Sequence, residues 1–373
     1  MIKLLSDIKV LEMGTFITGP ACGMFLADLG ADVIKVERPA TGDPFREFNG
    51  GYYSPHFQTY NRNKRSIELN TTDAVDLARF DQLIKEADVF IENFRPGVAD
   101  KLNISAERLQ KLNPNLVYCS ISGFGSDGPD ALKPAFDTVA QAASGFLRLL
   151  INPAAPRVVG PAIADAITGF YASQGVLAAL LSRAKTGKGC LVEISMLEAM
   201  THFNLDDFTH YFSEGLVMGP QSRPNVSQSY VFQCQDQKWL ALHMSSPVKF
   251  WEGLAAAVGH PEMLQRPEFA SRQARIQNYD KVQAFLQPLF ATRPLAYWCQ
   301  RLTEIEVPHS PVYTSAEALE TPQAKHLQLA VSTEHPTLGQ YRTVRSPFRI
   351  NGEFATEFIA PPLLGEHNGQ GFK

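Results

Sequence analysis

Over the first 200 residues, short apolar runs alternate with longer stretches that have helical periodicity. The apolar runs are rich in β-branched residues and have the length of buried strands, which predicts strands at residues 8–13, 32–37, 66–69, 89–92, 116–120 and 191–195. The stretches between them predict helices at residues 22–29, 74–86, 106–112 and 165–183. Apolar strands separated by helices are typical of parallel βαβ units. The predicted fold class is therefore α/β, with a Rossmann-like sheet covered by helices on both faces.

The pattern changes after about residue 200. Residues 213–228 are rich in Gly, Pro, Ser and Asn, as linkers are, and strand-like and helical runs follow at 229–233, 240–244, 248–258 and 280–290. Near the end of the chain, one more strand-like run at 340–344 precedes a Pro-Pro turn. We predict a large Rossmann-like domain from residues 1–200 with 325–373, a linker at 201–228, and a small α+β domain with its return linker at 229–324.

Composition and charge argue against several classes of protein. Hydrophobic residues make up 45% of the 373 residues and charged residues 19%, which is enough apolar material for packed cores. The net charge of −4 argues against binding to nucleic acid or to a membrane surface through bulk charge. Five scattered cysteines without a CxxC pair argue against a disulfide framework, and we expect no metal site. The sequence shows no signal-peptide pattern and no apolar run of about 18 residues, so we expect a cytoplasmic protein that does not enter the membrane.

A Rossmann-like start raises the question of a nicotinamide cofactor. The pyrophosphate-binding turn requires glycines spaced as GxGxxG, so that the backbone can approach phosphate at a helix N-terminus. The glycines that follow the first strand are Gly14, Gly19 and Gly23, which have a different spacing. Glu37, at the end of the second strand, does have the position of the acidic residue that binds the ribose of NAD in Rossmann folds. Without the glycine turn, we do not expect NAD to bind.

Asp165 stands at the beginning of the predicted helix 165–183, which is apolar over most of its length. An Asp at this place often caps the helix, because its carboxylate accepts a free backbone N–H, and from the residues alone this is the simpler interpretation. The helix N-terminus also favours an ionised carboxylate, which can act as a nucleophile. The residues leave both roles open, and the two roles are compatible.

Seven segments, in order along the chain, resemble the class III CoA-transferases. They are IKVLEMGTFITGPACGMFLADLGADVIKVERPATGDPFR (8–46), NRNKRSIELN (61–70), ADVFIENFRPGVADKLNI (87–104), NPNLVYCSISGFGSDGP (113–129), FDTVAQAASG (136–145), ADAITGFYASQGVLAALLSRAKTGKG (164–189) and APPLLGEHNGQ (360–370). This superfamily contains formyl-CoA transferase, carnitine CoA-transferase and α-methylacyl-CoA racemase. The resemblance implies a Rossmann-like large domain formed by both chain ends, a small domain, and a homodimer in which two ring-like subunits interlock.

The resemblance also implies roles for single residues. Asp165 matches the family's nucleophilic aspartate, and backbone N–H groups at its helix start would stabilise the oxyanion. The positions that match CoA contacts are Arg38, Leu69, Asn70, Thr71, Asn93, Phe94, Arg95, Lys101, Phe136 and Asp137. No cofactor is expected to be tightly bound, since the coenzyme A thioester is itself a substrate. The expected partners are an acyl-CoA and a small carboxylic acid, with dicarboxylates such as succinate suggested by analogy.

At three places the sequence departs from the family pattern. Thr72 stands where the family often has a lysine that contacts phosphate, and Pro134 stands where a second lysine is common, with Lys133 beside it. Ile17 replaces a polar residue of formyl-CoA transferase, so the formyl and oxalate pair is not expected.

The racemase branch of the superfamily offers the main alternative function. Exchange of the proton α to a thioester needs two opposed acid/base groups, typically a His and a Glu. These would fall at Phe136 and Ser246, neither of which can do that work. We therefore predict a CoA-transferase that moves CoA from an acyl-CoA donor to a carboxylic acid through an aspartyl anhydride and an enzyme–CoA thioester. The alternative is a racemase or epimerase of the 2-methylacyl-CoA type, and a CoA-binding protein without activity is a third class.

Overall fold

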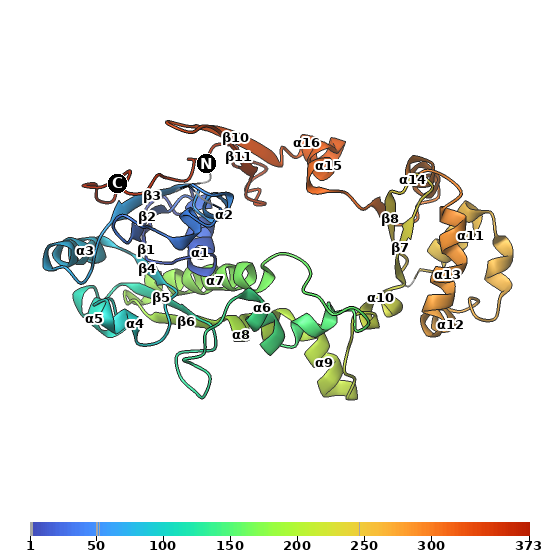
Figure 1. The fold of residues 1–373 in the computed structure, drawn as a ribbon, viewed down its shortest axis with the longest axis horizontal. Coiled ribbons are helices and arrows are strands. Elements are labelled where there is room, and N and C mark those ends of the chain that lie inside the picture. The colour runs from blue at the N-terminus through green and yellow to red at the C-terminus, as the bar shows by residue number, and fades with distance from the viewer. Residues whose placement is uncertain (1–2, 50, 52, 246) are drawn as a thin grey trace. The chain divides into compact units, whose positions relative to one another are not determined.

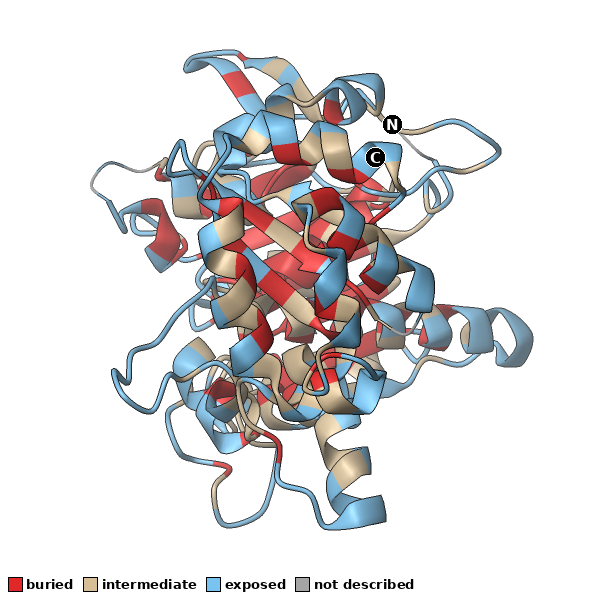
Figure 2. Ribbon diagram, turned by 90° about the vertical axis from the view of Figure 1, so that its right-hand side faces the viewer, coloured by how far each residue is buried: buried red, intermediate tan, exposed pale blue. Residues whose placement is uncertain are grey.

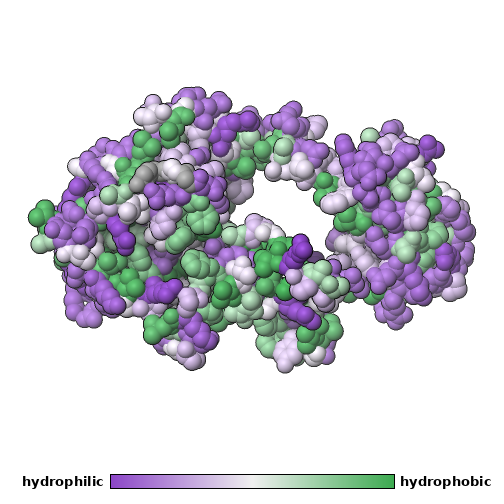
Figure 3. All heavy atoms as spheres, viewed as in Figure 1, coloured by the Kyte–Doolittle hydropathy of each residue, from purple (hydrophilic) through white to green (hydrophobic). Residues whose placement is uncertain are grey.

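The computed structural model describes residues 3–49, 51, 53–245 and 247–373. Contacts within the chain divide it into two compact units. The first unit combines Met1–Leu147, Val158–Leu205 and Gln323–Lys373, and the second combines Arg148–Arg157 and Asp206–Pro322. On the face shown in Figure 3, hydrophilic residues cover most of each unit and hydrophobic residues form small groups.

A parallel sheet forms the centre of the first unit (Figure 1). Its strands are β1 (Lys9–Glu12), β2 (Asp32–Glu37), β3 (Lys64–Glu68), β4 (Val89–Glu92), β5 (Val117–Ser122) and β6 (Leu191–Ser195). They lie in the order β3-β2-β1-β4-β5-β6, and every neighbouring pair is parallel. This is the strand order of a doubly wound nucleotide-binding sheet. All six predicted strands are present, and the predicted α/β class is confirmed.

Helices cover both faces of this sheet. Because side chains alternate along a strand, Val10 and its neighbour Leu11 belong to different core clusters on opposite faces of β1. One face is covered by α1 (Thr18–Asp28) and α7 (Ile163–Thr186), and the other by α3 (Ala74–Glu86) and α5 (Ala106–Leu112). Figure 2 shows the result, with buried strands enclosed by helices whose outer sides are exposed.

Shorter elements complete the first unit and connect it to the second. They are the 3-10 helices η1 (Pro44–Arg46) and η2 (Phe146–Leu149), the helices α2 (Pro55–Tyr60), α4 (Val98–Lys101), α6 (Asp137–Ala143), α8 (Met196–Phe203) and α16 (Pro322–His326), and the antiparallel pair β10 (Ala330–His335) and β11 (Gly339–Val344).

The C-terminal segment of the chain lies along β3, so both chain ends build the first unit. Asn63 donates its backbone N–H to the carbonyl of Ile359 at 2.9 Å, and His367 donates to the carbonyl of Ser66 at the same distance.

The second unit contains a three-stranded antiparallel sheet, with helices packed on one side. The strands are β7 (Ser229–Gln233), β8 (Trp239–His243) and β9 (His309–Pro311), in that order. The helical elements are α9 (Leu205–Glu214), α10 (Ser222–Ser227), α11 (Val248–Val258), η3 (Pro261–Gln265), α12 (Arg272–Gln277), α13 (Tyr279–Phe290), α14 (Leu295–Glu304) and α15 (Ser315–Glu320).

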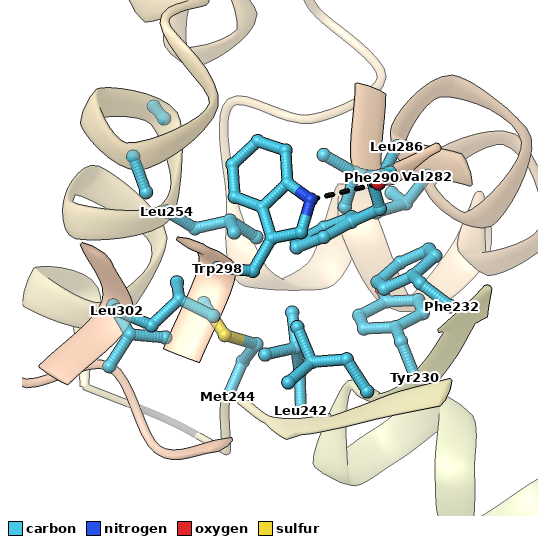
Figure 4. Packing of buried hydrophobic residues seen from close by; sticks show 14 of the residues in the cluster. Tyr230, Phe232, Leu242, Met244, Leu254, Val282, Leu286, Phe290, Trp298 and Leu302 are labelled. Atoms are coloured by element: carbon cyan, nitrogen blue, oxygen red, sulfur yellow. Dashed lines mark hydrogen bonds between the residues drawn. The ribbon is translucent and has the colours of Figure 1, made fainter. Parts of the chain in front are cut away.

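Aromatic side chains fill the core of the second unit (Figure 4). The rings of Phe232 and Phe290 stack with centroids 4.5 Å apart. Trp298 packs on Phe290 and donates its indole N–H to that residue's backbone carbonyl at 2.8 Å. The indole N–H of Trp298 is thereby paired, whereas that of Trp251, in the same core, has no hydrogen-bond partner among the described residues.

The structure differs from the predicted domain boundaries at two places. Residues 201–228, predicted as a linker, include the end of α8 and the helices α9 and α10. Pro224 is compatible with α10 because it lies in the first turn, where a backbone N–H has no partner within the helix. Residues 148–157, which we expected in the large domain, group with the second unit.

Helix α7 is long and apolar enough to cross a membrane, if only length and composition are considered. It is the one such helix in the described part of the chain. Its apolar residues Ala172, Val176 and Leu180 pack into the core beneath the sheet, together with residues of α1 and β5. A buried core helix meets the same criterion.

Candidate active site

The strand order of the sheet reverses between β1 and β4, and open α/β sheets bind ligands at the carboxyl ends of the strands beside such a point. Asn93, directly after β4, joins the two loops there. Its Oδ1 accepts a hydrogen bond from the backbone N–H of Thr15 at 2.8 Å. Its Nδ2 donates to the Thr15 carbonyl at 2.7 Å and to Thr18 Oγ1 at 2.8 Å. The Asn93 amide therefore holds the loop after β1 in place.

Close packing explains the glycines after β1, which lack the nucleotide-binding spacing. A Cβ on Gly19 would lie 2.9 Å from the Cα of Gly14 and 3.3 Å from the Asn93 side chain. A Cβ on Gly23 would lie 2.1 Å from a carboxylate oxygen of Glu12. These glycines allow α1 to approach β1 and β4.

A cavity of about 480 Å³ opens beside the carboxyl ends of β1, β2 and β3. Five of the predicted CoA contacts line it: Arg38, Leu69, Asn70, Thr71 and Phe94. The Thr71 side chain is 2% exposed, and its hydroxyl has no hydrogen-bond partner among the described residues. A buried hydroxyl without a partner in a cavity wall is available to a polar ligand.

A second cavity, of about 280 Å³, contains Asp165. Thr15 and Phe94 line both cavities, so the two adjoin. The predicted residues that line the second cavity are Asn93, Phe94, Arg95, Phe136 and Asp165. Two predicted contacts line neither cavity: Lys101 is exposed at the end of α4, and Asp137 begins α6.

Asp165 does not cap its helix. Helix α7 begins at Ile163, and Asp165 lies in the first turn. The capping carboxylate comes from Asp137 instead, whose Oδ1 accepts from the backbone N–H groups of Ala164 at 2.8 Å and Asp165 at 3.4 Å. The capping interpretation of Asp165 is therefore wrong, because a carboxylate from a distant segment already occupies these donors. The oxyanion role expected of these N–H groups stays a prediction, and in this structure Asp137 accepts their hydrogen bonds.

Burial raises the pKa of Asp165 to about 7, and the nearby charge of Asp137 adds to this effect. The Asp165 carboxyl therefore holds its proton to a higher pH than an exposed Asp does, and a change in its surroundings shifts its protonation. The phenol of Tyr60 is near both carboxyl groups. Burial, followed by the charges of Asp165 and Asp137, raises the pKa of Tyr60. Sequence reasoning missed Tyr60, since it belongs to no spaced motif.

A buried network of charges lies beneath the loop after β1. Lys35 Nζ is 2.8 Å from Glu12 Oε1 and 3.0 Å from Asp43 Oδ2, and Lys64 Nζ is 2.7 Å from Glu12 Oε2. Asp43 Oδ1 also accepts from the backbone N–H of Phe16 at 3.1 Å. The network thus reaches the wall of the Asp165 cavity. It was not apparent from the sequence, because its members lie on different strands and loops.

Phe16 has a left-handed backbone, with φ of 61°, which is unusual for a residue other than glycine. In this conformation its ring contacts Phe136 edge to face, with centroids 5.7 Å apart. Both residues line the Asp165 cavity.

Comparison with known proteins agrees with this geometry. A model of CoA-transferase family III matches residues 5–368. The chain belongs to CoA-transferase family III. It is 32% identical to succinyl-CoA–D-citramalate CoA-transferase of Chloroflexus aurantiacus, over 99% of this chain and 93% of that protein. It is 33% identical to acetyl-CoA:oxalate CoA-transferase of Acetobacter aceti, over 92% of this chain and 88% of that protein. It is 31% identical to formyl-CoA:oxalate CoA-transferase of Escherichia coli, over 97% of this chain and 93% of that protein.

Solved structures of family proteins share the fold of this family III CoA-transferase. A CAIB/BAIF family protein from Brucella suis is 30% identical, with a TM-score of 0.86 over 98% of both chains. Rv3272 from M. tuberculosis is 27% identical, also with a TM-score of 0.86 over 98% of both chains. The predicted family and the prediction of an enzyme are thus confirmed.

Two positions bear on the racemase alternative for this family III enzyme. Phe136, at the place of the expected proton-transferring His, contacts Phe16 and has no group that can carry a proton. Ser246 lies outside the described residues. Among the described residues, no group of three or more His, Cys, Asp or Glu is placed to hold a metal ion.

Proposed function

We propose that this family III enzyme moves CoA from an acyl-CoA donor to a carboxylic acid acceptor, with Asp165 as the nucleophile. One observation carries the proposal: the Asp165 carboxyl lies in a cavity that adjoins a larger, partly polar cavity at the switch point of the sheet. A long thioester can occupy both cavities, with its reactive carbon at one end.

In this proposal, the larger cavity holds the CoA nucleotide. Arg38, at its exposed rim, is suited to phosphate because a guanidinium offers paired donors in a fixed geometry. The pantetheine passes Phe94 and Arg95, which line the Asp165 cavity. The Asn93 side chain contributes by positioning the loop rather than by direct contact, since Thr15 and Thr18 occupy its amide.

The chemistry consists of four displacements. The Asp165 carboxylate attacks the thioester carbonyl, forms a C–O bond and expels the CoA thiolate, which leaves an acyl–aspartyl anhydride. The thiolate then attacks the aspartyl carbonyl and releases the first acid, and the product is an enzyme–CoA thioester. The acceptor carboxylate displaces the thiolate to give a second anhydride. Attack by the thiolate on the acceptor's acyl carbon forms the new acyl-CoA and restores Asp165.

Replacement of Asp165 by Asn tests the proposal. Exchange of labelled acid into acyl-CoA should fall by at least about 10⁴-fold, because an amide cannot form the anhydride. Asp280→Asn is a matched control, since Asp280 also lies in the first turn of a helix and is exposed. Exchange by Asp165→Asn at the rate of the unsubstituted enzyme contradicts the proposal. Deuterium incorporation at the α-carbon of the acyl group without acid exchange supports the racemase alternative instead.

Arg38→Ala tests the proposed CoA site. We expect KM for acyl-CoA to rise about tenfold with little change in kcat, because the nucleotide lies far from the reacting carbon. Free CoA should lose affinity by a similar factor in a binding titration. Equal affinity of Arg38→Ala and the unsubstituted enzyme for CoA would show that Arg38 does not contribute to CoA binding.

We further propose a homodimer of interlocked subunits, which the family resemblance implies, and a cytoplasmic location. Sedimentation at several protein concentrations tests the first point, and fractionation of cells that express the tagged protein tests the second.

A further inference from the structure

Apolar side chains make up a large part of the wall of the Asp165 cavity. Phe16, Ile17, Phe136 and Met196 line it, and the side chains of Ile17 and Met196 are 7% and 5% exposed. Ile17 stands where the resemblance leads us to expect a polar side chain. The acyl group of a bound thioester therefore meets carbon surface.

An aromatic surface continues from this cavity. The ring of Phe16 contacts Phe136 on one side and Phe45 on the other, with centroids 5.7 Å and 5.2 Å away. Phe45 in turn contacts Phe48 at 5.2 Å. Phe136 and Phe48, the two ends of the series, are 58% and 59% exposed. Large aromatic side chains that remain exposed beside a reactive group mark a surface that apolar ligands can cover.

A second carboxylate on the acyl group would find little compensation in this cavity. Two cationic side chains line the cavity, and one of them, Lys133, forms an ion pair with Asp130 at 2.7 Å. The other, Arg95, also lines a neighbouring cavity that contains the carboxyl groups of Glu92, Glu193 and Glu198. An ion moved from water to apolar surroundings without a partner is strongly disfavoured. Asp165 and Asp137 add negative charge to the same region.

We propose that the acids exchanged by this enzyme are apolar monocarboxylic acids, branched or aromatic, whose side chains pack on Phe16, Ile17 and Phe136. This inference rests on the proposed function and names its substrate class. It differs from the dicarboxylates suggested by analogy, and from the acids in the names of the three relatives described above.

Two isosteric donors test the inference directly. In 4-methylpentanoyl-CoA an isopropyl group takes the place of the distal carboxylate of succinyl-CoA, so the two differ in charge and hardly in shape. With 3-methylbutanoate, a branched monocarboxylic acid, as the acceptor, we expect kcat/KM for 4-methylpentanoyl-CoA to exceed that for succinyl-CoA by at least about tenfold, which is the value of burying a large apolar group. An equal or higher value for succinyl-CoA overturns the inference.

The variant Phe136→Ala tests whether the aromatic surface causes this preference. The ratio of the two kcat/KM values should fall about tenfold, since one face of the acyl site is removed. Val75→Ala, which changes a 78% exposed residue of α3 outside the cavity, should keep the original ratio. An unchanged ratio in Phe136→Ala overturns the assignment of the acyl group to this surface.

Failure of the inference can be distinguished from failure of the proposed function. If Asp165→Asn abolishes exchange and succinyl-CoA is the better donor, the transferase function stands and the substrate class is wrong. If neither donor supports exchange that depends on Asp165, the proposed function itself fails, and the substrate class fails with it.

Discussion

The two units of the chain are stabilised in different ways. The first unit buries several charged side chains, including Glu12, Lys35, Asp43 and Lys64, directly beneath the loops that form the candidate site. Among the described residues of the second unit, Arg275 is the buried charged side chain, and aromatic rings dominate the core. Buried ion pairs contribute little net stability, because desolvation offsets their attraction. Their position suggests that the first unit uses them to hold the site loops in one conformation.

The pKa directions in this network show how tightly its members depend on one another. Burial alone would raise the pKa of Glu12, but Lys35 and Lys64 hold it below its usual value. Burial lowers the pKa of Lys64 to about 8, against the attraction of Glu12. Removal of one member therefore leaves an uncompensated charge, whereas an apolar core loses contacts without such a penalty.

The largest effect on stability is expected for Lys35→Met. The substitution leaves Asp43 and Glu12 without their shared cation, so the free energy of unfolding should fall by about 3–5 kcal/mol at pH 8. Glu12 keeps only Lys64 as its cation in the variant, so its pKa should rise relative to that in the unsubstituted protein. Protonation of Glu12 then offsets part of the loss, and the deficit should be smaller at pH 5. Circular dichroism during urea denaturation measures both values; a loss under about 1 kcal/mol contradicts the assigned role.

Trp298→Phe is the corresponding test in the second unit. It removes the hydrogen bond to the Phe290 carbonyl and leaves that carbonyl buried, which should lower stability by about 2 kcal/mol. No charge is involved, so the loss should be the same at pH 5 and pH 8. Because all three tryptophans lie in the second unit, the two that remain, Trp239 and Trp251, report its unfolding by fluorescence. If the stability loss of Trp298→Phe changed strongly with pH, the two units would not differ in how charge contributes to their stability.

Asp165→Asn should stabilise the protein while it abolishes exchange. The pKa of Asp165 is raised to about 7 by burial and by Asp137, so the folded protein binds a proton that the unfolded chain releases. Stability therefore falls as pH rises from about 4 to 7. Because Asp165 is partly exposed, we expect a gain of only about 1–2 kcal/mol at pH 8 for the variant, and almost none at pH 4. Equal stability of both proteins at pH 8 contradicts the raised pKa.

The smallest effect is expected for Asp137→Asn, measured as a change in the pH profile. Activity of the unsubstituted enzyme should fall as pH drops below about 7, because the protonated Asp165 carboxyl is not a nucleophile. The amide of this variant keeps an oxygen for the backbone N–H groups of Ala164 and Asp165 but removes the negative charge. The acid limb of kcat/KM should therefore move to lower pH by about half a unit. Movement to higher pH would show that Asp137 favours ionisation of Asp165.

The sequence predicted most of the first unit because the strands β1, β2, β4 and β5 are mostly buried and contain runs of apolar residues. Helix α10 escaped prediction, since its composition is that of a turn. The position of Asp165 followed from the resemblance, but the capping role of Asp137 did not, because 28 residues separate the donor and acceptor in sequence. The buried network and Tyr60 became visible only when the fold brought separate segments together.

The central claim, covalent chemistry on Asp165, is most directly tested by trapping the intermediate. The enzyme is incubated with a panel of acyl-CoAs and hydroxylamine, digested, and examined by peptide mass spectrometry. We predict a hydroxamate on the peptide that contains Asp165, formed only with acyl-CoA and absent from Asp165→Asn. An unmodified Asp165 peptide in enzyme that exchanges acids, or a hydroxamate on a different carboxyl group, would contradict this account.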